Sequence, residues 1–344
     1  MIILGIETSC DETATAIVKD GQTVLSSVIA SSQEMHAKTG GIIPENAARE
    51  QIKSIIPVIE QAISKAKLWD VTQHVPQHTT HNTPSIDAIA VTVGPGLIGS
   101  LLIGVETART LSWAWNKPLI PVNHLIGHLY ANWIDNTPSL PAVALVVSGG
   151  HTDIVLMKNH KEIEWLGGTR DDAAGECFDK CARLLDLGFP GGPAIAKAAK
   201  SHKSRVTSHQ IRLPRPLLDE KSFDFSFSGL KTAVLREVDR WKKPVLAYEI
   251  QEAITDVLVQ KTLKAVKHHK VDTLLVAGGV AANSRLKEKF ELEIGHWKLD
   301  INLHVPPPKL CTDNAIMIAS AAFFNNKPIP WEEVSTNPSL TITQ

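Results

Sequence analysis

The fold is decided near the start of the chain, where residues 2–30 read IILGIETSCDETATAIVKDGQTVLSSVIA. This stretch holds three apolar runs of strand length, at residues 2–6, 14–19 and 23–30. The polar turn 7–13 separates the first two runs. Asp20 and Gly21 separate the last two, and both positions of such a pair accept a positive φ, which favours a tight hairpin. We therefore predict three antiparallel strands with a polar turn between the first and the second.

The same design returns in the middle of the chain. Short polar turns again separate apolar runs that predict strands, at residues 142–147, 154–157 and 163–166. Residues 171–187 follow with apolar side chains at helical spacing. Asp171 and Asp172 stand at the start of this segment, where acidic residues favour a helix N-terminus, so we expect them to cap the helix.

A second pair of segments is also repeated. An apolar run at residues 86–93 ends in glycine and leads into a predicted helix that reaches Trp115. A run at residues 271–277 likewise ends in glycine and leads into a helix near Arg285. The order of these elements predicts a duplicated α/β architecture, with two related halves around a cleft.

The length and composition agree with two folded domains. The chain has 344 residues, more than a single hydrophobic core usually supports. We place the first domain at residues 1–130, completed by a helix at 313–330, and the second at residues 140–312. Hydrophobic residues make up 43% of the chain and charged residues 21%, which excludes a disordered protein.

Charge and cysteine content exclude several classes of protein. The net charge of −1 argues against nucleic-acid binding by the whole surface and leaves a local basic patch open. The four cysteines form no CxxC pair, which argues against a disulfide framework or a zinc knuckle and fits a reducing compartment. No apolar run reaches about 18 residues, and the first run is too short for a signal peptide. We expect a cytoplasmic protein with no membrane contact.

The segment NHLIGH at residues 123–128 is a candidate metal site. His124 and His128 stand four residues apart, so on a helix their imidazoles share one face and can bind one ion. A chain with 14 histidines also produces this spacing by chance, and the segment lacks the glutamate of the HExxH motif. A third ligand is required. Asp313 is a candidate, and its alternative role is the N-cap of the apolar helix that follows it.

Glycine-rich turns are candidate phosphate sites because their backbone N–H groups can approach an anion closely, and a following helix adds a favourable dipole. The chain has four of them, at residues 94–96, 148–152, 190–193 and 278–279. None forms a Walker motif or a GxGxxG motif, which disfavours the P-loop and Rossmann folds.

Three further features each allow two interpretations. Asp11 and Glu12 can orient a metal-bound water or a substrate amine, or can lie solvated at a loop tip. Asp179 can face a cleft or solvent. Residues 223–232 alternate apolar and polar side chains, which favours an edge strand; the alternative is an RNA-contacting element in which Lys231 touches phosphate.

Ten segments, in this order, closely resemble the tRNA threonylcarbamoyladenosine transferase family, whose members were formerly described as O-sialoglycoprotein endopeptidases. The resemblance spans nearly the whole chain. The segments are GIETSCDETATA (5–16), GGIIPENAAR (40–49), GPGLIGSLLIG (94–104), NHLIGH (123–128), LVVSGGHT (145–152), DDAAGECFDK (171–180), FPGGP (189–193), FSFSGLKT (225–232), AGGVAAN (277–283) and CTDNA (311–315).

The resemblance implies a fold and a set of ligands. The fold would be the actin-like, Hsp70-like ATPase fold, with two duplicated α/β lobes around a cleft. His124, His128 and Asp313 would bind one divalent metal ion per subunit, Fe²⁺ in the first place and Zn²⁺ as the alternative. The residues that would bind threonylcarbamoyl-adenylate are Val147, Ser148, Gly149, Gly150, His151, Asp179, Gly192 and Asn283.

The implied reaction moves the threonylcarbamoyl group from threonylcarbamoyl-AMP to N6 of adenosine 37, in tRNAs that read codons beginning with A, and releases AMP. We expect Asp11 or Glu12 to position or deprotonate the attacking amine. The expected partners are tRNA, a paralogous scaffold protein (TsaB-like) and a small ATPase (TsaE-like), with no membrane.

The chain departs from the family pattern at a few positions. Members often carry an aromatic residue where Thr39 stands and a histidine where Gln51 stands. Many bacterial members carry an acidic residue within 194–196, and the loop 72–85 is longer than usual. Two alternative functions on the same fold are a non-catalytic scaffold paralogue and a small-molecule kinase or ATPase. A metalloprotease is the third alternative.

Overall fold

The computed structural model describes residues 1–32, 35–36, 41–69, 83–203 and 211–344. Thr39 and most of the predicted loop 72–85 lie outside these ranges. The contacts divide the chain into two compact units. The first unit combines Met1–Thr137 with Asp313–Gln344, and the second is Pro138–Thr312.

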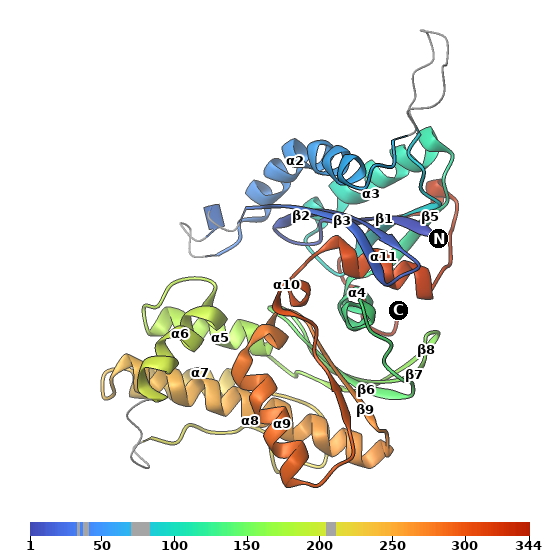
Figure 1. The fold of residues 1–344 in the computed structure, drawn as a ribbon. Helices are drawn as coiled ribbons and strands as arrows, with labels where there is room; N and C mark the ends of the chain where they lie inside the picture. Colours follow the sequence, from blue (N-terminus) through green and yellow to red (C-terminus); the bar gives the residue numbers. More distant parts are fainter. Residues whose placement is uncertain (33–34, 37–40, 70–82, 204–210) are drawn as a thin grey trace, which may run out of the picture. The chain divides into compact units, whose positions relative to one another are not determined.

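The first unit is built on a five-stranded sheet with the order β3-β2-β1-β4-β5 (Figure 1). Its strands are β1 (Ile2–Glu7), β2 (Glu12–Lys19), β3 (Thr23–Ser31), β4 (Ala88–Gly94) and β5 (Leu119–Asn123). The first three strands are antiparallel, while β4 and β5 run parallel to β1. Asp20 and Gly21 have φ angles of 52° and 69°, so the predicted hairpin is confirmed.

Helices cover both faces of this sheet (Figure 1). The helices of the unit are α2 (Pro44–Lys65), α3 (Ile98–Trp115), α4 (His124–Tyr130) and α11 (Ala315–Phe324), with the short turns η1 (Ala131–Trp133) and η3 (Trp331–Glu333). Leu4 and Ile6 pack into a core with Ile59 of α2 and Val105 of α3. Gly5 points to the opposite face, since successive strand residues alternate, and there it meets α11.

The second unit repeats this sheet. Its strands are β6 (Ala142–Val147), β7 (Thr152–Asn159), β8 (Glu162–Gly168), β9 (Thr273–Ala277) and β10 (Asn302–His304). Their order is β10-β9-β6-β7-β8, again with an antiparallel meander on one side and two parallel strands on the other. The predicted duplication is therefore confirmed.

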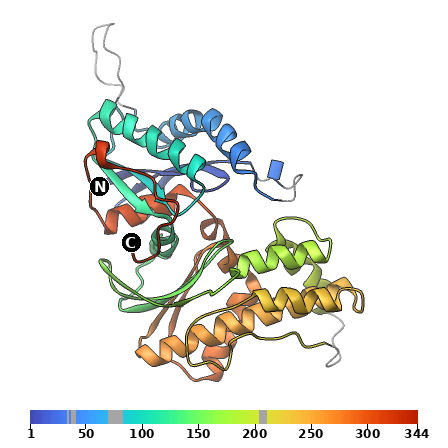
Figure 2. The ribbon, with the colours of Figure 1, turned by 180° about the vertical axis from the view of Figure 1, so that it is seen from behind.

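One long helix organises the second unit. The 27-residue helix α8 (Lys243–His269) packs against β6 and also contacts α5, α6, α7 and α9 (Figure 2). The remaining helices are α5 (Ala174–Leu184), α6 (Gly191–Lys203), α7 (Ser228–Glu237), η2 (Gly279–Ala282), α9 (Ser284–His296) and α10 (Pro308–Cys311). Across the described ranges, no helix combines the length and apolar character needed to span a membrane.

Two local predictions in the second unit are wrong. Asp171 and Asp172 do not cap α5, whose N-cap is Ala173. The carboxylate of Asp171 instead accepts hydrogen bonds from the backbone N–H groups of Phe227 (2.7 Å) and Ser228 (3.3 Å), so it caps α7. This long-range cap begins a helix where alternation had favoured an edge strand, because α7 occupies the second half of residues 223–232.

The close contact between β1 and α11 gives a stability prediction. A Cβ atom at Gly5 would lie 2.4 Å from the carbonyl oxygen of Ala315 and 3.0 Å from the Cβ of Ala319. Gly5→Ala should therefore lower the free energy of unfolding by about 1–3 kcal/mol, measured by denaturant titration. The control is Gly99→Ala in α3, where the new Cβ would meet only Ala48 at 3.5 Å. Equal stability of the two variants would contradict the packing described here.

Candidate metal centre and glycine-rich site

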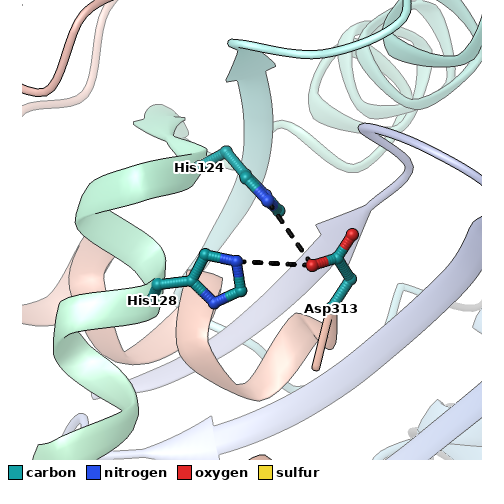
Figure 3. A group of neighbouring side chains, drawn as sticks. All are labelled: His124, His128 and Asp313. Carbon is teal, nitrogen blue, oxygen red and sulfur yellow. Dashed lines mark ion pairs between the residues drawn. The ribbon is translucent and has the colours of Figure 1, made fainter. Parts of the chain in front are cut away.

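Three potential metal ligands meet in the first unit. His124 and His128 lie on α4, and Asp313 lies just before α11 (Figure 3). The Nε2 atoms of His124 and His128 are 3.5 and 3.3 Å from Oδ1 of Asp313. One ligand atom from each residue lies within 4.8 Å of the other two, so the three residues can share one ion. The predicted helical geometry of the histidine pair is confirmed, with ring centroids 4.6 Å apart.

Local sequence explains how these side chains are placed. The side chain of Asn123 accepts a hydrogen bond from Leu125 N and starts α4 directly before His124. Gly127 lets α4 approach α11, since a Cβ there would lie 2.7 Å from Cδ1 of Ile318. The N-cap of α11 is Asn314, whose side chain accepts from Met317 N. The alternative role of Asp313 as a helix cap is therefore wrong, and its carboxylate is left for the histidines.

The ionisation of Asp313 and His128 suits a cation. Burial disfavours the charged form of Asp313, but the adjacent histidines outweigh it and hold the pKa of Asp313 far below its usual value. Burial lowers the pKa of His128, so this imidazole is neutral at pH 7. Neither of its ring nitrogens makes a hydrogen bond to any described residue, although it is 1% exposed. A buried nitrogen lone pair beside a carboxylate is the environment that a divalent metal ion fits.

Glu7 is a buried residue of the site that the sequence reasoning missed. It ends β1 with 1% of its surface exposed, and its Oε2 lies 3.0 Å from Nδ1 of His124. Burial opposes the ionised form, but the charge of His124 prevails and lowers the pKa of Glu7. Burial also opposes the charge on His124, yet Glu7 and Asp313 together raise its pKa above the usual value. The overlooked sequence signal is that an acidic residue ends an apolar strand, where a charged side chain needs a partner.

Asp11 ends the turn that follows β1, and Glu12 is the first residue of β2. Gln51 of α2, itself 1% exposed, donates from Nε2 to the carbonyl oxygens of Cys10 (3.1 Å) and Glu12 (3.0 Å). Ser32 donates to the carbonyl oxygen of Asp11 at 2.6 Å. The turn is therefore held by its backbone, which leaves the two carboxylates to other roles.

The surroundings of these carboxylates favour their neutral forms. Burial and the negative charge of Asp313 raise the pKa of Asp11. Burial, with smaller contributions from Asp11 and Asp313, raises the pKa of Glu12 to about 7, against a hydrogen bond from Ser31. Asp11 also lines a cavity of about 340 Å³ together with Thr13, Ser31, Met35, Glu50 and Ser54. The predicted interpretation of this pair as a fully solvated loop tip does not fit this burial.

The glycine-rich turn of the second unit connects β6 to β7. Val147 ends β6, and Ser148 and His151 close the turn by hydrogen bonds of 2.9 Å (Ser148 N to His151 O) and 3.2 Å (His151 N to Ser148 Oγ). A Cβ atom at Gly149 or Gly150 would meet no atom of the described residues within 4 Å. Packing inside the protein therefore does not require glycine at these two positions.

Glycines in neighbouring elements allow the backbone of those elements to lie against this turn. A Cβ at Gly175, in the first turn of α5, would lie 2.4 Å from the carbonyl oxygen of Ser148. Gly278 has a φ of 94°, and a Cβ there would lie 2.4 Å from the carbonyl oxygen of Val147. The ends of the parallel strands β6 and β9 and the N-terminus of α5 thus converge on the glycine turn.

Asp179 and Asn283 both act as caps at this side of the second unit. Oδ1 of Asp179 accepts from Gly191 N at 2.6 Å, which joins α5 to the start of α6 beside Gly192. Asn283 caps α9 by accepting from Arg285 N at 2.9 Å, and its Nδ2 donates to Gln251 at 3.3 Å. One carboxylate oxygen of the half-buried Asp179 is thus bonded to a helix N-terminus.

The raised pKa of Glu12 predicts a pH effect on stability. An unfolded glutamate ionises near pH 4.5, whereas Glu12 in the folded chain keeps its proton to about pH 7. The unfolding free energy of the wild type should therefore fall as the pH rises through this interval, and Glu12→Gln should remove the loss. With allowance for the partial exposure of this side chain, we expect the unfolding free energy of the variant, relative to that of the wild type, to increase by about 1–2 kcal/mol from pH 5 to pH 8. The measurement is denaturant unfolding with a chelator present, and parallel pH profiles would contradict it.

Known proteins are similar to this sequence over nearly its full length. The family model described as tRNA N6-adenosine threonylcarbamoyltransferase (TsaD) matches residues 23–320. A protein of that name from Thermomicrobium roseum is 47% identical over 357 residues, covering 94% of this chain and 92% of the relative. One from Persephonella marina is 47% identical over 329 residues, covering 94% and 90%.

Solved structures of distant sequence share the fold. HypF from T. kodakarensis aligns with a TM-score of 0.60 at 12% identity, over 94% of this chain and 47% of that one. Component A of the Acidaminococcus fermentans (R)-2-hydroxyglutaryl-CoA dehydratase aligns with a TM-score of 0.51 at 14% identity, over 94% and 98%. These likenesses confirm the predicted actin-like, Hsp70-like ATPase fold. With the family model matched from residue 23 to residue 320, the chain belongs to the tRNA N6-adenosine threonylcarbamoyltransferase (TsaD) family.

Proposed function

We propose that this chain transfers the threonylcarbamoyl group from threonylcarbamoyl-AMP to N6 of adenosine 37 in tRNAs that read codons beginning with A. The bond between the carbamoyl carbon and the phosphate oxygen breaks, AMP leaves, and a new bond joins that carbon to N6. Family membership supports the reaction. The observation that carries it for this chain is the complete donor set of His124, His128 and Asp313, which a non-catalytic paralogue does not need.

The donor set fits one divalent metal ion. Two imidazole nitrogens and one carboxylate leave coordination positions for a substrate, as catalytic sites require. We propose Fe²⁺ as the ion and Zn²⁺ as the alternative, since both accept imidazole and carboxylate ligands. When bound, the ion supplies a positive charge that stabilises negative charge developing during acyl transfer.

We assign the adenylate to the glycine turn of the second unit. The proposed binding residues are Val147, Ser148, Gly149, Gly150, His151, Asp179, Gly192 and Asn283. The absence of Cβ atoms at Gly149 and Gly150 lets an anion approach the backbone N–H groups, and the nearby N-terminus of α5 adds favourable dipole. The cap made by Asp179 supports the proposal, because it fixes the first turn of α6 beside Gly192.

Asp11 or Glu12 is proposed to position or deprotonate the N6 amine. A general base works best when its pKa lies near the working pH, and the pKa of Glu12 is about 7. Oε2 of Glu12 is buried and has no hydrogen-bond partner among the described residues, so it is available to an incoming group. Wild-type rates in both Asp11→Ala and Glu12→Gln would exclude the assignment.

The partners proposed for the reaction are tRNA, a TsaB-like scaffold paralogue and a TsaE-like ATPase. With a net charge of −1, the chain lacks the overall positive charge that favours polyanion binding. A partner or a local patch then supplies part of the positive surface for tRNA. We propose that the reaction takes place in the cytoplasm, in keeping with a tRNA substrate.

The other functions explain less of the site. A small-molecule kinase or ATPase of the same fold gives no role to the histidines of α4. A metalloprotease would need a general base of the HExxH type, and the residue after His124 is Leu125.

The reaction is tested with unmodified tRNA. The chain is incubated with both partner proteins, an adenylate synthase, threonine, bicarbonate and ATP, and the nucleosides are analysed by mass spectrometry. We expect the threonylcarbamoyl nucleoside with wild type and a loss of at least about 100-fold with His124→Ala, in line with losses seen when a key stabilising group is removed. Absence of product with wild type, or unchanged product with the variant, would refute the proposal.

The glycine turn gives a second prediction. Gly150→Ala should change the unfolding free energy by less than about 0.5 kcal/mol, because the new Cβ meets no protein atom. It should nevertheless raise the KM for threonylcarbamoyl-AMP, because the substrate occupies the space. Gly295→Ala in α9 is the matched control, also free of contacts within 4 Å, and should leave KM unchanged. An unaltered KM in Gly150→Ala would remove this turn from the substrate site.

A further inference from the structure

We infer that Glu7 is a positioning residue for the metal site, holding Nδ1 of His124 so that Nε2 faces the ion. The inference rests on the metal site of the proposed function and goes beyond it, since Glu7 itself is not a ligand. It is linked to the trio through its hydrogen bond with His124.

The carboxylate of Glu7 is fixed at both oxygens. Oε1 accepts a hydrogen bond from Ser9 N, and Oε2 accepts from Oγ1 of Thr92, both at 2.5 Å. Oε2 also lies 3.0 Å from Nδ1 of His124. Because the group is 1% exposed, no solvent competes for these positions, and the carboxylate cannot rotate without leaving a buried donor unpaired.

This geometry selects one nitrogen of His124 for the ion. A carboxylate accepts a hydrogen bond and cannot donate one when ionised, so Nδ1 carries the hydrogen. In the neutral ring that a metal ion requires, the lone pair is then on Nε2, the atom that lies 3.5 Å from Oδ1 of Asp313. Carboxylate partners of this kind orient histidine ligands and make them more basic.

The second histidine is positioned differently. Nδ1 of His128 is buried and makes no hydrogen bond within the described chain. Its place follows from the packing of α4 on α11, where Gly127 meets Ile318. Loss of Glu7 should therefore affect one ligand and leave the other in place.

The experiment compares Glu7→Gln with Glu249→Gln in the full-length chain. Both changes remove the charge of a buried carboxylate while keeping its shape, and Glu249 lies in the second unit, paired with Arg215. Zn²⁺ affinity is measured by competition with a chromogenic chelator. We expect Glu7→Gln to bind Zn²⁺ about 10–100-fold more weakly and Glu249→Gln to bind it like the wild type.

A spectroscopic measurement separates positioning from general damage. In the Co²⁺-loaded chain each ligand imidazole gives a paramagnetically shifted, exchangeable N–H proton signal. Glu7→Gln should shift or broaden the signal of one ring and leave the other unchanged. Should Glu7→Gln fail to fold, Glu7→Asp keeps the charge but withdraws the carboxylate from Nδ1, and the same weakening is expected.

The outcomes are distinct for the two proposals. Wild-type Zn²⁺ affinity in folded Glu7→Gln, or an equal loss in Glu249→Gln, would overturn the role of Glu7. A wild-type chain that binds no divalent ion would overturn it together with the metal site. Weakened binding in Glu7→Gln in a chain that makes no modified nucleoside would support the role of Glu7 and refute the proposed reaction.

Discussion

The close packing of α11 against β1 and α4 is the constraint on which the metal centre depends. The helix comes from the end of the chain, yet it touches strand residues at the beginning. Gly5 and Gly127 have no Cβ atoms where α11 approaches most closely. This docking brings Asp313 beside His124 and His128, which are almost two hundred residues earlier in the sequence. The geometry of the site therefore depends on the same packing that stabilises the core of the first unit.

Buried charge is the second feature that shapes the site. His124 lies between the carboxylates of Glu7 and Asp313, so that each charged group is next to a group of opposite charge. Buried charges require such pairing. His128 lies beside these groups and stays neutral because its burial outweighs the nearby carboxylate. The imidazole of His124, which has carboxylates on both sides, and the neutral imidazole of His128 thus face the same oxygen of Asp313.

The glycine turn of the second unit presents backbone groups in place of charged side chains. The turn lies where two parallel strands end and α5 begins, and Gly175 and Gly278 allow these elements to touch it. Asp179 and Asn283 stabilise the beginnings of α6 and α9, so their side chains have structural partners within this unit. Gly149 and Gly150 differ from these glycines because no atom of the described residues would lie within 4 Å of a Cβ there, which supports the proposed adenylate site.

The sequence by itself determined the repeated elements, because each depends on local periodicity and turn chemistry. The alternation of apolar runs with polar turns predicted both sheets, and the four-residue spacing placed His124 and His128 on one helical face. Only the tertiary structure decided which polar side chains serve as caps, since Asp171 caps the distant helix α7 and Asn314 frees Asp313 from that task. Only the tertiary structure also revealed Glu7 as the partner of His124, because hydrogen bonds between residues more than a hundred positions apart depend on packing that no local pattern encodes.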